Sequence, residues 1–163
     1  ASIVTLNDKI ALVPANSAGK VVYFATILHA HSLKVAALLD SDAAGDEAAK
    51  QDTLVHTLGN SRILRTKDSY KGAVAKPEVE DLLRETLVAV AKADLGWDVA
   101  ATAAAQPTRP IVELFANEIT GFSKYRLGKA YLRWTQNHAA SDLAAGEADQ
   151  WTDLIAKVNK ALR

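Results

Sequence analysis

Two aspartates one residue apart are the side chains of this chain that are best placed to do chemistry. An apolar run at residues 35–39 ends in Asp40 and Asp42, and small residues follow at 43–45. A buried parallel strand that delivers acids to the carboxyl edge of a sheet has this pattern, and open α/β sheets bind ligands at that edge. Alternate strand residues share a face, where two carboxylates repel unless a proton or a divalent cation lies between them. The pair predicts a metal site; the alternative is a cap on the following helix.

A second group of acids, Glu78-Val79-Glu80-Asp81, follows a proline at the start of a predicted helix. Acids after proline at a helix N-terminus are ordinary partners of the helix dipole, which is the simpler explanation. The group also follows the third predicted strand. This position favours the same edge of the sheet as the aspartate pair.

Lys124 begins a predicted helix whose other basic residues lie on a different face. Arg126, Lys129 and Arg133 fall at helical spacing and form one basic stripe, whereas Lys124 points away from it, toward the small Gly128. Lys124 could therefore reach into a site, or it could be an ordinary surface lysine whose charge extends to water. The stripe could contact nucleic-acid phosphates, or it could be a solvated face.

The predicted elements that position these residues alternate between strands and helices in the first part of the chain and are all helices in the rest. Strands predicted at 9–13, 35–39 and 62–65 alternate with helices at 20–31 and 43–58, which indicates a parallel sheet with right-handed crossovers. Helices follow at 79–93, 111–119, 123–137 and 143–162, with a proline-bounded linker at 106–110. The fold class is therefore α/β, a Rossmann-like parallel sheet flanked by helices, with an added helical subdomain.

Composition narrows the functions that this chain could have. The 19 basic and 19 acidic residues give a net charge of zero, so any DNA contact must use a local patch. The absence of cysteine excludes disulfides and thiolate metal sites and favours a cytoplasmic location. No stretch approaches the ~20 apolar residues of a membrane span, so we expect no membrane contact. The chain has no methionine, and we expect it to be a piece of a longer polypeptide.

Four stretches of the chain together resemble the TOPRIM nuclease domain of the OLD (overcoming lysogenization defect) family of ATP-dependent endonucleases. They are residues 13–20, 35–45 with Leu-Leu-Asp-Ser-Asp-Ala-Ala-Gly, 78–82 and 121–124, and the second is the most specific. The resemblance implies a TOPRIM-type α/β core at 1–84. It also implies a helical region at 85–163, whose helix 123–137 packs back near the active site.

The resemblance implies a metal-dependent DNA endonuclease that nicks or cleaves phosphodiester bonds by two-metal hydrolysis. Asp40 and Asp42 match the family's first pair of metal ligands, and Glu80 is the best match for the second set, with Glu78 nearby. Lys124 matches the lysine that stabilises negative charge on the scissile phosphate. Oxygen ligands and the lack of cysteine favour Mg²⁺ or Mn²⁺ over Zn²⁺.

The same resemblance implies the partners of this chain. Besides DNA, they are an N-terminal ABC-type ATPase of the same polypeptide, through which ATP acts, and a second copy of the full-length protein. The family's opening Glu-Gly-x-x-Asp motif has no match in residues 1–8, so either the piece begins after that motif or the motif was lost. Without it, we expect the piece alone to cut poorly.

Two other functions are compatible with the aspartate pair. One is a non-catalytic DNA-binding or assembly domain that retains a vestigial metal site. The other is an Asp-dependent phosphotransferase of the haloacid dehalogenase type. Ala44 stands where those enzymes carry threonine, which counts against this second alternative.

Overall fold

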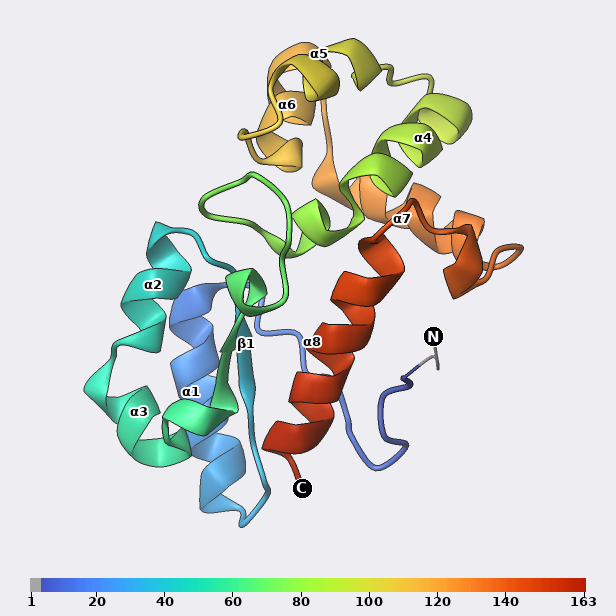
Figure 1. Cartoon of the computed structure of the whole chain (residues 1–163). Coiled ribbons are helices and arrows are strands. Elements are labelled where there is room, and N and C mark those ends of the chain that lie inside the picture. Colours follow the sequence, from blue (N-terminus) through green and yellow to red (C-terminus); the bar gives the residue numbers. More distant parts are fainter. Residues whose placement is uncertain (1–3) are drawn as a thin grey trace. The chain divides into compact units, whose positions relative to one another are not determined.

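The computed structural model describes residues 4–163, and the chain divides into two compact units (Figure 1). The first unit runs to Ser69 and also includes Trp151–Arg163. The second unit is Tyr70–Gln150. The boundary predicted at residue 84 therefore falls inside the second unit, where a helix begins.

The first unit is built on a strand–helix–strand crossover, as the sequence predicts. Strand β1 pairs in parallel with β2, and Leu39 lies opposite Arg65 at the carboxyl ends of the two strands. Helix α8 joins this unit through Lys157, whose ammonium bonds to the main chain of Asp68 just after β2. The elements are α1 (Ala18–Ala30), β1 (Ala37–Leu39), α2 (Ala43–Ala49), α3 (Asp52–Leu58), β2 (Ile63–Arg65) and the later part of α8 (Glu147–Ala161).

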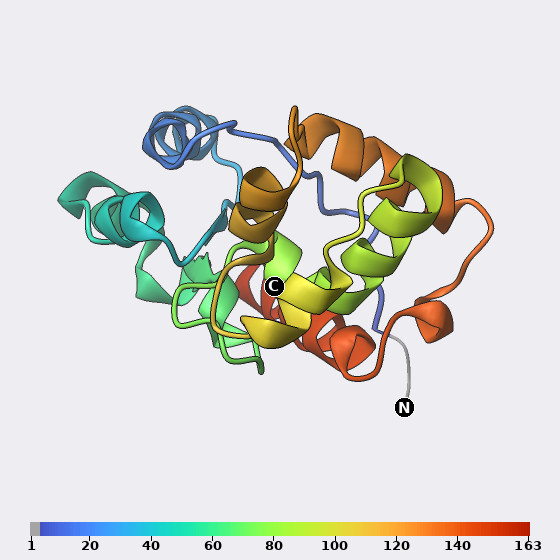
Figure 2. The ribbon, with the colours of Figure 1, turned by 90° about the horizontal axis from the view of Figure 1, so that it is seen from above.

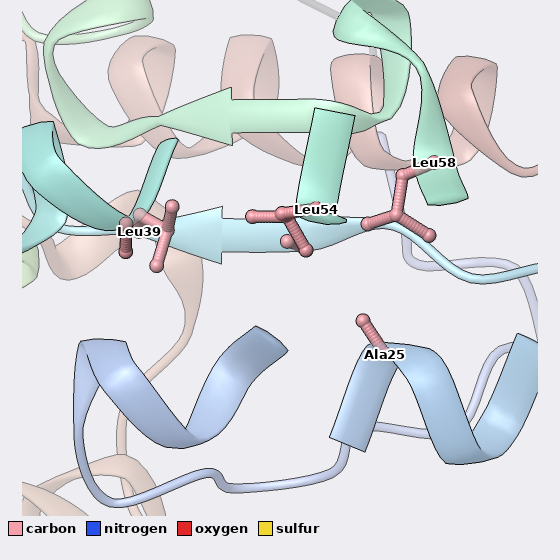
Figure 3. Close-up of a cluster of buried hydrophobic side chains, with 6 residues drawn as sticks. Ala25, Leu39, Leu54 and Leu58 are labelled. Carbon is pink, nitrogen blue, oxygen red and sulfur yellow. The ribbon is translucent and has the colours of Figure 1, made fainter. Parts of the chain in front are cut away.

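The core of the first unit lies between β1 and two helices (Figure 3). Leu39 lies at the end of β1, Leu54 and Leu58 come from α3, and Ala25 faces them from α1. Leu38, between the buried positions of the strand, is 42% exposed. Strand β1 is therefore buried on one face only, although its uninterrupted apolar run predicts burial on both.

Two predicted elements of the first unit are wrong. The strand expected at 9–13 is absent, and Leu12 and Val13 are 76% and 51% exposed. No strand pairs with this segment, and Pro14 after it has no N–H to donate.

The single helix expected at 43–58 is instead two short helices. The chain is extended at Gln51, where ψ is 124°, and α2 and α3 lie on either side of this break. Both pack against α1, as the view from above shows (Figure 2). The break allows each half to present its apolar side chains to α1.

The second unit is helical. Helix α7 packs against α4, and the helix expected at 79–93 begins as a 3₁₀ helix before it continues as α4. None of the helices in residues 4–163 has the length and apolar character that crossing a membrane requires. The elements are the 3₁₀ helix Val79–Leu83, α4 (Arg84–Leu95), α5 (Ala100–Ala105), α6 (Ile111–Glu118), α7 (Lys124–Thr135), the 3₁₀ helix Ala140–Asp142 and the start of α8.

The segment predicted as a linker is a fixed loop inside the second unit. The buried guanidinium of Arg84 donates to the carbonyls of Arg109 at 2.7 Å, Gln106 at 3.0 Å and Ala103 at 3.2 Å. It also lies 3.7 Å from the carboxylate of Asp81. Because one side chain bonds to two carbonyls of this loop and to a third in α5, residues 106–110 do not behave as a tether between domains.

We expect Arg84→Met to lower the free energy of unfolding by about 3 kcal/mol, because it leaves a buried carboxylate and three carbonyls without their donor. Chemical denaturation measures this change. Lys92→Met on the same helix is the control, since Lys92 is 59% exposed and pairs with Asp98 at the surface. Its loss should stay below about 1 kcal/mol. Equal effects of the two variants would contradict a structural role for Arg84.

Candidate functional site

Asp40 and Asp42 lie in the loop that leaves β1 and enters α2. Asp42 is the N-cap of α2, and its Oδ1 accepts the N–H of Gly45 at 2.7 Å. The capping alternative is therefore correct for one oxygen of Asp42. A carboxylate has two oxygens, so the cap is compatible with metal binding through the other.

Arg65, at the end of β2, holds this loop from the neighbouring strand. Its Nη2 donates to the carbonyl of Asp40 at 2.6 Å and lies 2.8 Å from the carboxylate of Asp46 in α2. Because Leu39 and Arg65 are paired in the sheet, the two strand ends lie side by side. The sequence did not point to Arg65; the available signal was a basic residue as the last residue of a short apolar strand.

Thr66 follows Arg65 and contacts Asp40 directly. Its hydroxyl lies 3.1 Å from the carbonyl of Leu39 and 3.3 Å from Oδ1 of Asp40. One residue further, the N–H of Lys67 donates to the hydroxyl of Ser41 at 2.9 Å. The hydroxyls of Thr66 and Ser41 are both buried, and together they tie the loop after β1 to the chain that follows β2.

Gly45 explains the small residues that follow the aspartates. A Cβ at this position would lie 1.9 Å from the carbonyl oxygen of Asp40 and 3.1 Å from Oδ1 of Asp42. The chain folds back on itself so closely here that only glycine fits. The requirement for a small residue at 45 therefore comes from the loop's own main chain.

Both carboxylates line a pocket of about 450 Å³ in the first unit. The pocket is also lined by residues 15–18 and Val21, around the start of α1, and by Leu38 and Leu39 of β1. Ser17, at the N-cap position of α1, makes no side-chain cap. The lining thus combines two acids with a helix N-terminus, which carries a partial positive charge.

The second acidic group separates into two kinds of carboxylate. Asp81 is buried, with 2% exposed, and accepts the N–H groups of Ile111 at 2.8 Å and of Glu78 at 2.9 Å. Burial raises the pKa of Asp81, even though these hydrogen bonds and the Arg84 guanidinium favour its charged form. Asp81 is therefore a structural residue that organises the starts of two helical segments.

Glu78 and Glu80 meet at the ammonium of Lys124. The Nζ lies 3.2 Å from Oε2 of Glu78 and 3.0 Å from Oε1 of Glu80. Partial burial disfavours the charged lysine, but the hydrogen bond and charge of Glu80, together with Glu78, outweigh it and raise the pKa of Lys124. A cation thus already lies between two carboxylates, and oxygen donors of this kind also suit a divalent ion.

The basic stripe on α7 is exposed at all three positions. Each of these side chains also has a partner within the second unit, so phosphate contact stays a prediction. Arg126 lies over the ring of Trp97 at 5.0 Å, Lys129 lies over that of Tyr125 at 5.6 Å, and Arg133 pairs with Asp94.

The predicted site residues form two sets in different units. Asp40 and Asp42 belong to the first unit, and Glu78, Glu80 and Lys124 belong to the second. Within residues 4–163, no three acidic, histidine or cysteine side chains form a group that could hold a metal ion. In comparisons with protein-family models, curated proteins and solved structures, the chain has no match.

We expect Gly45→Ala to destabilise the first unit by about 3 kcal/mol or more, because the added Cβ overlaps the Asp40 carbonyl. Gly19→Ala in α1 is the matched control, since a Cβ there meets nothing within 4 Å. Alanine should stabilise that helix by about 0.5 kcal/mol. Urea unfolding of the two variants measures both changes, and a neutral Gly45→Ala would contradict the close packing of this loop.

We expect Lys124→Met to lower the free energy of unfolding by less than about 1 kcal/mol at neutral pH, because half of the lysine side chain is exposed. The raised pKa means that the folded state holds the proton more tightly. The stabilisation is therefore complete below the ordinary value of 10.5 and is lost as pH rises through the raised value. Urea unfolding at pH 7 and at a series of pH values above 10.5, with exposed Lys76→Met as the control, measures this. A difference that does not shrink as pH rises above 10.5 would contradict the pairing.

Proposed function

We propose that this chain is a TOPRIM-type, metal-dependent endonuclease domain that hydrolyses phosphodiester bonds of DNA. The observation that carries the proposal is the placement of Asp40 and Asp42. They follow a parallel strand, and both line one pocket. We further propose that the domain acts in the cytoplasm, in a polypeptide with an ABC-type ATPase that makes cutting ATP-dependent and that pairs with a second copy.

The donor set of the pocket suits Mg²⁺ or Mn²⁺. Asp40 and Asp42 offer carboxylate oxygens, which hard divalent cations prefer. Bound ions of this kind activate a water molecule and stabilise the leaving oxygen in phosphodiester hydrolysis. Asp42 would bind through the oxygen that does not cap α2, so that metal binding and the helix start share one side chain.

Glu78, Glu80 and Lys124 supply the second set of groups in the proposed reaction. The two glutamates would hold a further cation, and the ammonium that now lies between them shows that their oxygens accept positive charge. Lys124 is charged at neutral pH and would stabilise negative charge on the scissile phosphate. The exposed Arg126, Lys129 and Arg133 would hold the DNA backbone.

We expect Asp40→Asn and Asp42→Asn each to reduce Mg²⁺- or Mn²⁺-dependent plasmid nicking by more than about 100-fold, since even residues that only support metal ligands change affinity by about 10- to 100-fold. Asparagine caps helices as well as aspartate does, so Asp42→Asn preserves the start of α2. Asp52→Asn removes an exposed carboxylate of the same unit and is the control. Gel assays of nicking measure the loss, and full activity of both variants would contradict the assignment.

Measurements of Mn²⁺ binding and beryllofluoride capture, set beside the nicking assay, separate the alternative functions. Mn²⁺ binding without cleavage of any DNA, even by a polypeptide extended upstream of residue 1, would favour a non-catalytic DNA-binding or assembly domain. Capture of beryllofluoride at Asp40, again without DNA cleavage, would favour a phosphotransferase. Cleavage that requires Asp40 and Asp42 supports the nuclease.

A further inference from the structure

The buried hydroxyl of Thr66 lies within hydrogen-bond distance of the carboxylate that the proposed function assigns to a metal, and it shares its one proton between that carboxylate and the carbonyl of Leu39. We propose that Thr66 is a positioning residue that orients the Asp40 carboxylate for a divalent cation. This inference rests on the proposed nuclease function and adds to it a residue that is not itself a ligand.

The sheet register explains why Thr66 can do this. Leu39 and Arg65 are the last residues of paired parallel strands, so the next residues, Asp40 and Thr66, leave the sheet side by side. The Thr66 hydroxyl lies 3.3 Å from Oδ1 of Asp40 and 3.1 Å from the carbonyl of Leu39. Since only 1% of Thr66 is exposed, water competes little for this hydroxyl.

Arg65 and Thr66 act on different parts of the same residue. The Arg65 guanidinium holds the main-chain carbonyl of Asp40 at 2.6 Å, so it determines where the chain runs. Thr66 contacts Oδ1 of the side chain, so it limits rotation of the carboxylate. Asp42 is held in a similar way by the N–H of Gly45. Each aspartate thus has an oxygen that is held by the protein.

Holding one oxygen of a carboxylate orients the other before a cation arrives. Groups that hydrogen-bond to metal-binding side chains raise metal affinity by about 10- to 100-fold because the ligand does not have to be reorganised. The Thr66 hydroxyl meets this description for Asp40. Its effect should appear in cation affinity more strongly than in fold stability, because the hydroxyl is one hydrogen bond among several that hold the loop.

The test compares the Mn²⁺ affinity of four proteins by isothermal titration calorimetry. Thr66→Val keeps the branched shape and removes the hydroxyl, whereas Thr66→Ser keeps the hydroxyl. Ser69→Ala is the matched control, because Ser69 is also buried after β2 but its hydroxyl contacts Lys157. We expect Mn²⁺ to bind about 10- to 100-fold more weakly to Thr66→Val and with wild-type affinity to the other two variants.

Thermal unfolding without metal accompanies each titration, and Thr66→Ala replaces Thr66→Val if the valine variant does not fold. Wild-type affinity in a folded variant without the hydroxyl would overturn the inference while leaving the proposed function intact. Equal weakening in Ser69→Ala would also overturn it, because the effect would then be general. A wild type that binds no Mn²⁺ would overturn the metal assignment itself, and the inference with it.

Discussion

The parallel pairing of β1 with β2 is the constraint on which the chemistry of the first unit depends. It brings the two strand ends together, so that Arg65 and Thr66 bond to Asp40 and the N–H of Lys67 bonds to Ser41. A sheet of two strands is marginal alone and needs packing on one face. Helices α1 and α3 supply that packing, so the loop that carries the acids is only as ordered as the apolar cluster beneath it.

In the second unit, a buried ion pair fixes the main chain that carries the acidic residues. Arg84 and Asp81 between them bond to the loop at 106–110 and to the start of α6. Both partners have several hydrogen bonds, which is the condition under which buried charges are tolerated. Because Asp81 is fixed in this way, Glu78 and Glu80, which precede it in the chain, are held where both meet Lys124.

Local patterns in the sequence were enough to predict the crossover, most helices and the position of Asp40 and Asp42 after a strand. The strand at 9–13 was wrong because an apolar run does not reveal whether a neighbouring strand exists. The break at Gln51 carries no glycine or proline, and it follows from packing on α1. The roles of Asp81 and Thr66 depend on partners about 30 residues away in the chain, which no local pattern contains.

The acidic tract at 78–81 combines carboxylates that will respond differently to ionic strength. Asp81 has a fully buried side chain, whereas 26% of the Glu78 side chain and half of the Lys124 side chain are open to solvent. At physiological salt, exposed charges are screened beyond about 8 Å, and buried pairs are screened much less. Added salt will therefore weaken the hold of the glutamates on Lys124 while the Asp81–Arg84 frame keeps its geometry. A cation that displaces Lys124 from the glutamate oxygens should therefore move side chains alone, while the main chain held by Asp81 and Arg84 stays in place.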